Sequence, residues 1–279
     1  MKRLLNTIKF SHTAFALPFA ILAACLAVHG IPAGRDLAWI VAAALGARTA
    51  AMAFNRLADL RFDRVNPRTR AWPLSRGEVS PGAVAILLIG GAGVFLFASW
   101  SLNSWTRALC VPTLAVLLGY SITKRFTWGC HFALGFALAI APAGGWIALR
   151  PGWDPVWGLL SAGVLFWVAG FDILYACQDV RFDRREGLHS IPARFGIPTA
   201  LRASCAVHVV CALLFAAAWA AAGLGALAAC GTAAAAALLV FQHRWVRASD
   251  LSRVNAAFFT ANGLLSAVLM STWLIDMAF

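Results

Sequence analysis

Long apolar runs alternate with short polar intervals along the whole chain. Nine runs approach the length of about 20 residues that a helix needs to cross a bilayer. These runs cover residues 13–31, 37–56, 82–100, 106–123, 131–149, 156–177, 203–222, 224–241 and 256–275. The pattern predicts an all-α fold, a polytopic membrane protein in which about nine transmembrane helices form a single membrane domain over residues 1–279.

Composition supports this interpretation and excludes a soluble domain. Hydrophobic residues make up 61% of the 279 residues and charged residues only 12%. A soluble domain carries about 25% charged residues. Residues Met1-Lys2-Arg3 lead into an apolar run without a small-residue cleavage site, so we expect no cleaved signal peptide. We therefore expect an integral membrane protein.

The basic residues indicate how the helices are oriented. In a soluble protein the net charge of +12 would suggest a nucleic-acid partner, but here the basic residues gather in connections on one side. With a cytoplasmic N-terminus, 19 of the 23 lysines and arginines lie on the cytoplasmic side, as the positive-inside rule requires. The exceptions are Arg35, Arg107 and Arg150, which fall outside, and Arg48, which lies within a span. We therefore expect the protein to interact with a lipid bilayer and not with nucleic acid. We expect it to reside in the inner (plasma) membrane of a bacterium.

Two hexapeptides, residues 59–64 and 179–184, match at every position except the second. Each contains two aspartates four residues apart, a spacing that places both carboxylates on one face of a helix. The aspartates are Asp59, Asp63, Asp179 and Asp183. If the two pairs face each other, they form a cage of four carboxylates. Mg²⁺ is held by a few carboxylates together with substrate phosphates, so the repeat predicts a metal–diphosphate site on the cytoplasmic side.

Other polar residues accompany the two pairs. Asn55 precedes Asp59 by one helical turn, and Asp172 and Tyr175 precede the second pair on the same helical stripe. A carboxylate near the membrane core costs about 2.5–3.5 kcal/mol, so these groups should face a wet cavity that contains partners. Tyr120 and Lys124, at the end of the fourth span, have the spacing to reach diphosphate together.

Two loops, residues 64–81 and 184–200, are longer than a helix connection needs, and loops of this length are often functional lids. His12, at the start of the first span, and His189, in the second loop, are candidates for contact with a substrate. The remaining histidines, which show no metal-ligand spacing, are His29, His131, His208 and His243.

Two other classes of protein also use intramembrane carboxylates. A secondary transporter is one alternative, although transporters place such groups near the midplane on broken helices. Here they lie at cytoplasmic helix ends. A CDP-alcohol phosphotransferase is the other, but its single compact motif, with Gly and Arg between the aspartates, is missing from this sequence.

The motifs resemble those of the UbiA superfamily of intramembrane prenyltransferases, and the resemblance covers essentially the whole chain. That family carries Asn-x-x-x-Asp-x-x-x-Asp, a second Asp-x-x-x-Asp and Tyr-x-x-x-Lys. The residues that match are Asn55, Asp59 and Asp63, then Asp179 and Asp183, then Tyr120 and Lys124. Within the family, Asn55-Arg56, Asn66-Pro67-Arg68-Thr69 and residues 170–196 most resemble the 4-hydroxybenzoate polyprenyltransferase group. That group includes relatives thought to prenylate dihydroxynaphthoate in the futalosine route to menaquinone.

The resemblance implies an activity: Mg²⁺-dependent transfer of a polyprenyl group from polyprenyl diphosphate to the ring of a hydroxylated aromatic acid. The acceptor would be 4-hydroxybenzoate or 1,4-dihydroxy-6-naphthoate, in ubiquinone or menaquinone biosynthesis. The four aspartates would hold the metal, and the residues that would bind diphosphate are Arg56, Arg61, Tyr120, Lys124 and Arg181. Asn55 and Asp172 would act in catalysis, Asp172 by orienting the acceptor ring or accepting its proton. Tyr175 and His12 would contact the acceptor or support the site.

This sequence departs from the family pattern at two positions. Arg56 stands where many members have a third aspartate, a change that is common in the 4-hydroxybenzoate group. Trp72 precedes Pro73-Leu74 where many members have arginine, so one expected diphosphate contact is lost. Arg70 or Arg76 is placed in the sequence to supply that contact instead.

Overall fold

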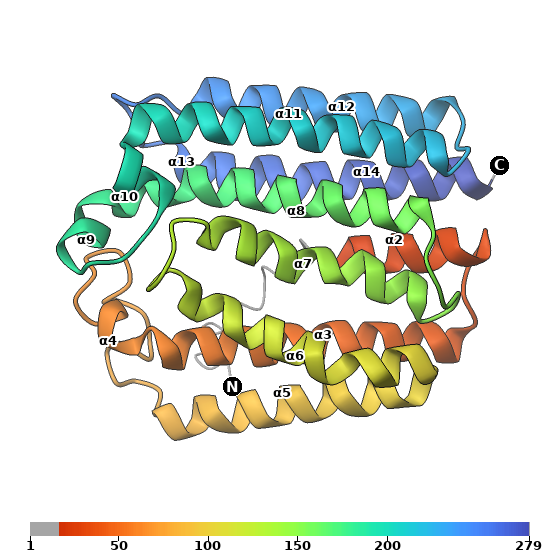
Figure 1. The fold of residues 1–279 in the computed structure, drawn as a ribbon, viewed down its shortest axis with the longest axis horizontal. Helices are drawn as coiled ribbons and strands as arrows, with labels where there is room; N and C mark the ends of the chain where they lie inside the picture. The colour runs from red at the N-terminus through yellow and green to blue at the C-terminus, as the bar shows by residue number, and fades with distance from the viewer. Residues whose placement is uncertain (1–16, 279) are drawn as a thin grey trace.

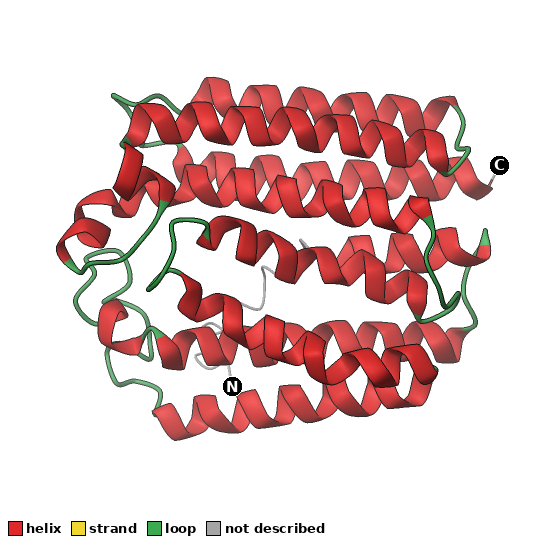
Figure 2. Ribbon diagram, in the orientation of Figure 1, coloured by secondary structure: helices red, strands yellow, loops and turns green. Residues whose placement is uncertain are grey.

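The structure, a computed structural model, describes residues 17–278. In that range the regular structure is helical, apart from one isolated β-bridge between Arg247 and Asp250 (Figure 2). Eight helices are long and apolar enough to cross a membrane, and α2 (Leu17–Val28) is a shorter apolar helix. The expected all-α membrane fold is confirmed, while the orientation of the N-terminus stays a prediction.

The apolar runs of the sequence each overlap one helix of this bundle. After α2, the long helices are α3 (Gly34–Ala58), α5 (Pro81–Leu102), α6 (Ser104–Thr123), α7 (Cys130–Ile147), α8 (Pro155–Ala176), α11 (Ile197–Ala221), α12 (Ala226–Trp245) and α14 (Asn262–Ala278). The short elements are α4 (Leu60–Asp63), the 3₁₀-helix η2 (Cys177–Asp179), α9 (Val180–Arg185), α10 (Ile191–Phe195), α13 (Val254–Ala256) and the π-helix η3 (Ala257–Ala261). Residues 223–225 do separate two helices, as the sequence predicts.

Local sequence signals explain where several helices begin. Helix α5 starts with Pro81 after Ser80, whose Oγ accepts a hydrogen bond from the Ala83 amide at 3.2 Å. Asn103 caps α6, and its Nδ2 also donates to the carbonyl of Ile147 at 2.8 Å. That contact joins the α5–α6 connection to the end of α7.

The long helices run side by side along the longest axis of the molecule (Figure 1). The short helices α4, α9 and α10 lie together at one end, on the left of Figure 1, and the C-terminus lies at the other. Because α4 contains the first hexapeptide and α9 the second, both acidic repeats are at the same end of the bundle.

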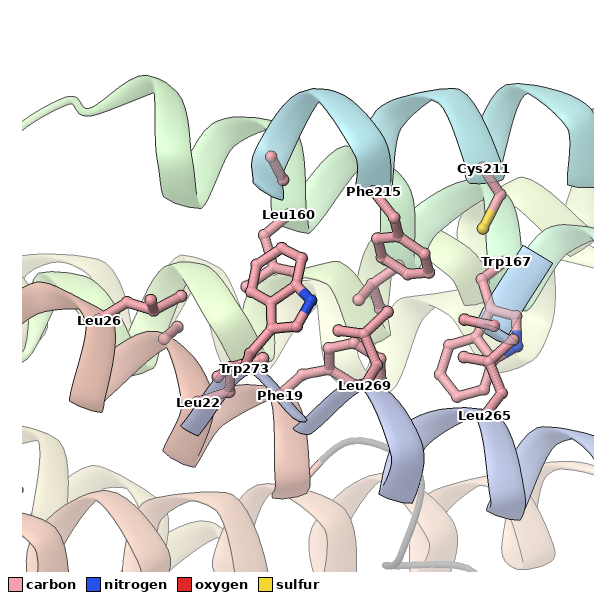
Figure 3. Packing of buried hydrophobic residues seen from close by; sticks show 14 of the residues in the cluster. Phe19, Leu22, Leu26, Leu160, Trp167, Cys211, Phe215, Leu265, Leu269 and Trp273 are labelled. Carbon is pink, nitrogen blue, oxygen red and sulfur yellow. The ribbon is translucent and has the colours of Figure 1, made fainter. Parts of the chain in front are cut away.

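The largest apolar core joins α2, α8, α11, α12 and α14 (Figure 3). Trp167 and Trp273 are fully buried in it, and Phe19 packs between Trp167 and Phe215 with ring centroids 5.3 and 5.9 Å away. The indole N–H groups of these two tryptophans have acceptors: Trp167 donates to Asn262 at 2.8 Å, and Trp273 donates to Thr232. This half of the bundle is closely packed.

Helix α3 lies against α5 at almost backbone-to-backbone distance. A Cβ atom added at Gly91 would lie 2.8 Å from the Ala50 amide nitrogen and 2.9 Å from the Gly46 carbonyl oxygen. Small residues permit this close approach between membrane helices. The contact fixes the position of α3, and the first acidic repeat begins directly after the last turn of this helix.

Candidate active site

The two acidic repeats adopt the same backbone conformation. Asp59 ends α3 with φ −93° and ψ 3°, and Asp179 ends η2 with φ −99° and ψ 5°. In both cases a short helix follows and carries the second aspartate of the pair. The Asp63 amide donates to the Asp59 carbonyl at 2.8 Å, so this pair stands one helical turn apart, as the sequence predicts.

Side chains of α3 hold the carboxylates of the first repeat. Arg56 Nη1 lies 3.2 Å from the Asp63 carboxylate, and Arg56 Nη2 donates to Asn55 Oδ1 at 2.6 Å. Asn55 Nδ2 in turn donates to Asp59 Oδ2 at 3.0 Å. Burial, reinforced by the neighbouring Asp63 carboxylate, raises the pKa of Asp59 above its usual range.

An arginine from the 64–80 loop holds the second repeat. Arg68 makes two parallel hydrogen bonds to Asp179, at 3.0 Å from Nε and 2.7 Å from Nη2. Asn66 Nδ2 donates to the same carboxylate at 3.3 Å, and Arg68 Nη1 donates to Tyr175 Oη at 3.4 Å. Bidentate arginine–carboxylate pairs are among the stronger hydrogen-bonded contacts in proteins. The first long loop is therefore anchored on the second repeat.

Two consecutive residues after α6 connect the repeats. Lys124 Nζ lies 2.7 Å from Asp183, and Arg125 Nη2 lies 3.5 Å from Asp59. Burial alone would lower the pKa of Lys124, but the Asp183 carboxylate more than offsets this effect, so the pKa lies above its ordinary value. One backbone segment thus places a positive charge on each repeat.

Trp72 forms a second connection between the repeats. The Arg56 guanidinium lies 4.1 Å from the centroid of the indole ring, and the Arg68 guanidinium lies 5.7 Å from it. Both distances fall in the range of cation–π attraction. Because Arg56 binds Asp63 and Arg68 binds Asp179, the indole links the two ion pairs. We call the four aspartates with Arg56, Arg68, Lys124 and Arg125 the ion-pair network.

The ion-pair network has the donor chemistry of a magnesium–diphosphate site. Its carboxylate oxygens are the hard ligands that Mg²⁺ prefers, and its four basic side chains suit phosphate oxygens. Each aspartate currently pairs with one base, and among residues 17–278 no three acidic, histidine or cysteine side chains are grouped to hold one metal ion. The residues fit the metal in chemistry, and the four-carboxylate cage stays a prediction.

An apolar cavity of about 590 Å³ lies between α2, α3, α5, α6, α7 and α8. Its lining is almost entirely apolar, but Arg48 of α3 and Tyr120 of α6 also line it. Lys124 follows Tyr120 by one turn and Asn55 follows Arg48 by two, so these two cavity residues lie on the side of the cavity toward the network. The Arg48 Nε is buried and has no hydrogen-bond partner within residues 17–278.

Asp172 forms a separate pair outside the ion-pair network. Its Oδ2 lies 2.7 Å from Nδ1 of His131, in the first turn of α7. The sequence places Asp172 on one stripe with Tyr175 and Asp179, yet the partner of Asp172 comes from a different helix.

A protein-family model, the UbiA prenyltransferase family, matches residues 16–264 of the chain. The chain belongs to the UbiA prenyltransferase family. It is 31% identical over 247 residues to a 4-hydroxybenzoate octaprenyltransferase of Nitrosospira multiformis, covering 85% of this chain and 81% of that relative. The chain is therefore a membrane prenyltransferase, and not a transporter or a CDP-alcohol phosphotransferase.

Solved structures of UbiA homologs share the fold. The chain superposes on a UbiA homolog from Aeropyrum pernix K1, in its apo structure, with a TM-score of 0.87 and 35% identity, covering 96% of this chain and 98% of that one. A UbiA homolog from Archaeoglobus fulgidus bound to DMAPP and Mg²⁺ matches with a TM-score of 0.73 and 16% identity, covering 99% of each chain.

Most site residues expected of a UbiA prenyltransferase lie in or beside the network, but some do not. Arg61 and Arg181 are exposed, and the Arg61 guanidinium stacks on the ring of Phe62 at 4.3 Å. Arg76, a suggested replacement for the arginine missing at position 72, instead pairs with Glu78 at 3.1 Å. The diphosphate roles of these residues remain predictions. The predicted acceptor contact of His12 lies outside the described residues.

Around the candidate site the structure also places residues to which the sequence assigned no role. They are Arg48, Asn66, Arg68, Arg125 and His131. For Arg48 a signal existed, because a charge within an apolar span marks a functional position. For Arg68 and Arg125, one arginine among several in a basic loop carries no such mark.

Proposed function

We propose that this UbiA prenyltransferase transfers a polyprenyl group from polyprenyl diphosphate to the ring of a hydroxylated aromatic acid. The acceptor is 4-hydroxybenzoate or 1,4-dihydroxy-6-naphthoate, in quinone biosynthesis on the cytoplasmic side of the bacterial inner membrane. The observation that carries this proposal is the position of the ion-pair network beside a 590 Å³ apolar cavity. One end of that arrangement suits a charged diphosphate and the other suits a prenyl chain.

The network supplies the donor site. Asp59, Asp63, Asp179 and Asp183 would hold Mg²⁺, which when bound neutralises charge on the departing diphosphate. Arg68, Lys124 and Arg125 would then pair with diphosphate oxygens in place of their present carboxylate partners. Fixed positive groups placed where leaving-group charge develops lower the barrier to ionisation.

The apolar cavity supplies the reaction chamber. When the allylic C1–O bond breaks, its electron pair leaves with the diphosphate and an allylic cation remains. The cavity keeps water from that cation, because its lining is almost wholly apolar. A ring carbon of the acceptor then bonds to C1, and the ring proton at that carbon passes to a base. Asp172 is the carboxylate that we assign to this step or to orientation of the ring.

Arg48 supplies a site for an anionic acceptor. It is a positive charge lining the apolar cavity, and its buried Nε has no hydrogen-bond partner among residues 17–278. A buried polar group without a partner is costly, so a ligand that brings a negative charge is favoured there. The carboxylate of a hydroxylated aromatic acid would pair with Arg48, and its ring would lie toward the donor end of the cavity.

The names of two relatives agree with the proposed acceptor and with the proposed donor. The Nitrosospira relative is called a 4-hydroxybenzoate octaprenyltransferase, and the Archaeoglobus homolog was solved with DMAPP and Mg²⁺. The first relative suggests the aromatic acceptor for this chain, and the second suggests the diphosphate donor and the metal.

The test uses purified protein in lipid nanodiscs with several polyprenyl diphosphates and each of the two acceptors. We expect one acceptor to be prenylated on its ring, as identified by mass, with activity lost in EDTA and restored by Mg²⁺. Turnover that survives complete chelation would contradict the metal site. Consumption of the donor without prenylation of either acid would contradict the acceptor class.

A further inference from the structure

The contact between His131 and Asp172 is short and sheltered. His131 is 1% exposed, whereas the Asp172 side chain is 25% exposed, so the carboxylate reaches accessible space and the imidazole does not. The two groups come from different helices, α7 and α8, and Nδ1 lies 2.7 Å from Oδ2. The buried imidazole ring therefore contacts the side of the carboxylate that faces the protein interior.

The second nitrogen of the ring determines its tautomer. The backbone N–H of Ile191, at the start of α10, donates to His131 Nε2 at 3.3 Å. A backbone N–H can only donate, so this contact gives Nε2 the acceptor role and leaves Nδ1, which lies against Asp172, as the donor. The amide of Ile191 thus sets the direction of the hydrogen bond on the other side of the ring.

The segment that supplies this amide is also bonded to the ion-pair network. Ser190 Oγ donates to the buried Asp183 carboxylate at 2.9 Å, and the His189 amide donates to the Lys124 carbonyl at 2.7 Å. Residues 188–191 therefore contact the expected diphosphate site on one side and His131 on the other. A continuous set of hydrogen bonds runs from Asp183 through this segment to Asp172.

We propose that His131 is a positioning residue for Asp172, and that residues 188–191 tie this pair to the diphosphate site. The inference rests on the proposed function, in which Asp172 takes the ring proton of the prenylated acceptor or orients the ring. His131 donates to the carboxylate from the protein side, keeps one oxygen fixed, and leaves the other directed toward the acceptor. Residues that orient a functional group in this way typically contribute 10- to 100-fold.

The test compares two amides that mimic different atoms of the imidazole. In His131→Asn the side-chain NH₂ takes the place of Nδ1 and can still donate to Asp172. In His131→Gln the amide reaches the place of Nε2, where it can accept from Ile191 but leaves Asp172 without its donor. We expect kcat to stay within about threefold for the Asn variant and to fall roughly 10- to 100-fold for the Gln variant, with the donor KM unchanged in both.

An isotope effect adds a readout that a purely structural role would not change. With acceptor deuterated at the prenylated ring carbon, the Gln variant should show a larger isotope effect on kcat than the wild type, because proton removal becomes slower. The loss should also be absent in an Asp172→Asn background if His131 acts through that carboxylate. Equal losses in both backgrounds would overturn the proposal.

Other outcomes are equally decisive. Activity retained in His131→Gln and lost in His131→Asn would mean that the ring only anchors α10, and the proposal would be wrong. Wild-type kcat in both variants would overturn it as well. Thermal unfolding of each variant in detergent identifies any that fail to fold, for which the Asp172→Asn single variant, altered at the other partner of the contact, is compared with the wild type instead. Wild-type kcat in that variant would overturn the proposal. Failure of the wild type to prenylate either acid would count against the proposed function, separately from this inference.

Discussion

Replacing Arg48 by leucine should lower kcat/KM for the aromatic acceptor and leave kcat/KM for the prenyl diphosphate donor unchanged. The substitution removes the positively charged side chain that lines the apolar cavity, and Arg48 Nε has no hydrogen-bond partner in the described part of the chain. A hydrogen bond to a charged group contributes about 1.5–3 kcal/mol. Since 1.4 kcal/mol is a factor of ten, kcat/KM for 4-hydroxybenzoate should fall by roughly 10- to 150-fold. Stability should hold or rise, because a buried charge without a full set of partners is replaced by an apolar side chain.

The assay is a cycle of two enzymes and two acceptors. Wild type and Arg48→Leu are each given 4-hydroxybenzoate and phenol, which keeps the hydroxyl group and lacks the carboxylate. The variant should lose activity toward 4-hydroxybenzoate alone, and Arg48→Lys should recover part of it because the charge is kept but the planar fork is not. Equal losses toward both acceptors, or no loss toward 4-hydroxybenzoate, would refute the assignment of Arg48 to the carboxylate.

Three further predictions concern the metal site, the packing and the orientation. Asp59→Asn and Asp179→Asn should each remove most turnover in steady-state assays. The double variant should be little worse than either single variant, because residues that act as a unit give non-additive losses. Losses that multiply would indicate that the two aspartates act independently. Gly91→Ala should lower the unfolding temperature, since overpacking costs about 1–3 kcal/mol. Gly90→Ala, whose Cβ would enter open space, should leave the unfolding temperature unchanged. Equal shifts of the two variants in a thermal melt would contradict the α3–α5 contact. A cysteine introduced beside Arg70 should resist impermeant thiol reagents added outside intact cells, and its labelling there would reverse the topology.

The helices were predictable because long apolar runs carry a strong, local signal. The repeat in residues 59–64 and 179–184 was equally informative, since it predicted both the helical turn between paired aspartates and their location at one end of the bundle. Tyr120 and Lys124 were predictable for the same reason, as spacing on one helix determines which side chains share a face.

The partners of those residues were not predictable. Arg68 binds Asp179 across 111 positions of sequence, and only the folded path of the 64–80 loop brings them together. His131 meets Asp172 across 41 positions, with no spacing pattern to connect them. Pairing between loops and helices depends on tertiary structure, which hydrophobic periodicity does not encode. The position of Arg48 in the cavity lining likewise follows from how six helices are packed around the cavity.

In the proposed reaction, the internal pairing of the four aspartates bears on how diphosphate is released. The affinity of any charged ligand for this end of the bundle is a difference between contacts formed and internal contacts given up. When diphosphate departs, Arg68 can return to Asp179 and Lys124 to Asp183, so no buried carboxylate is left uncompensated. Each turnover therefore ends in a conformation that the protein stabilises by itself. A site of bare carboxylates and bare arginines would hold diphosphate more tightly and would slow the next cycle.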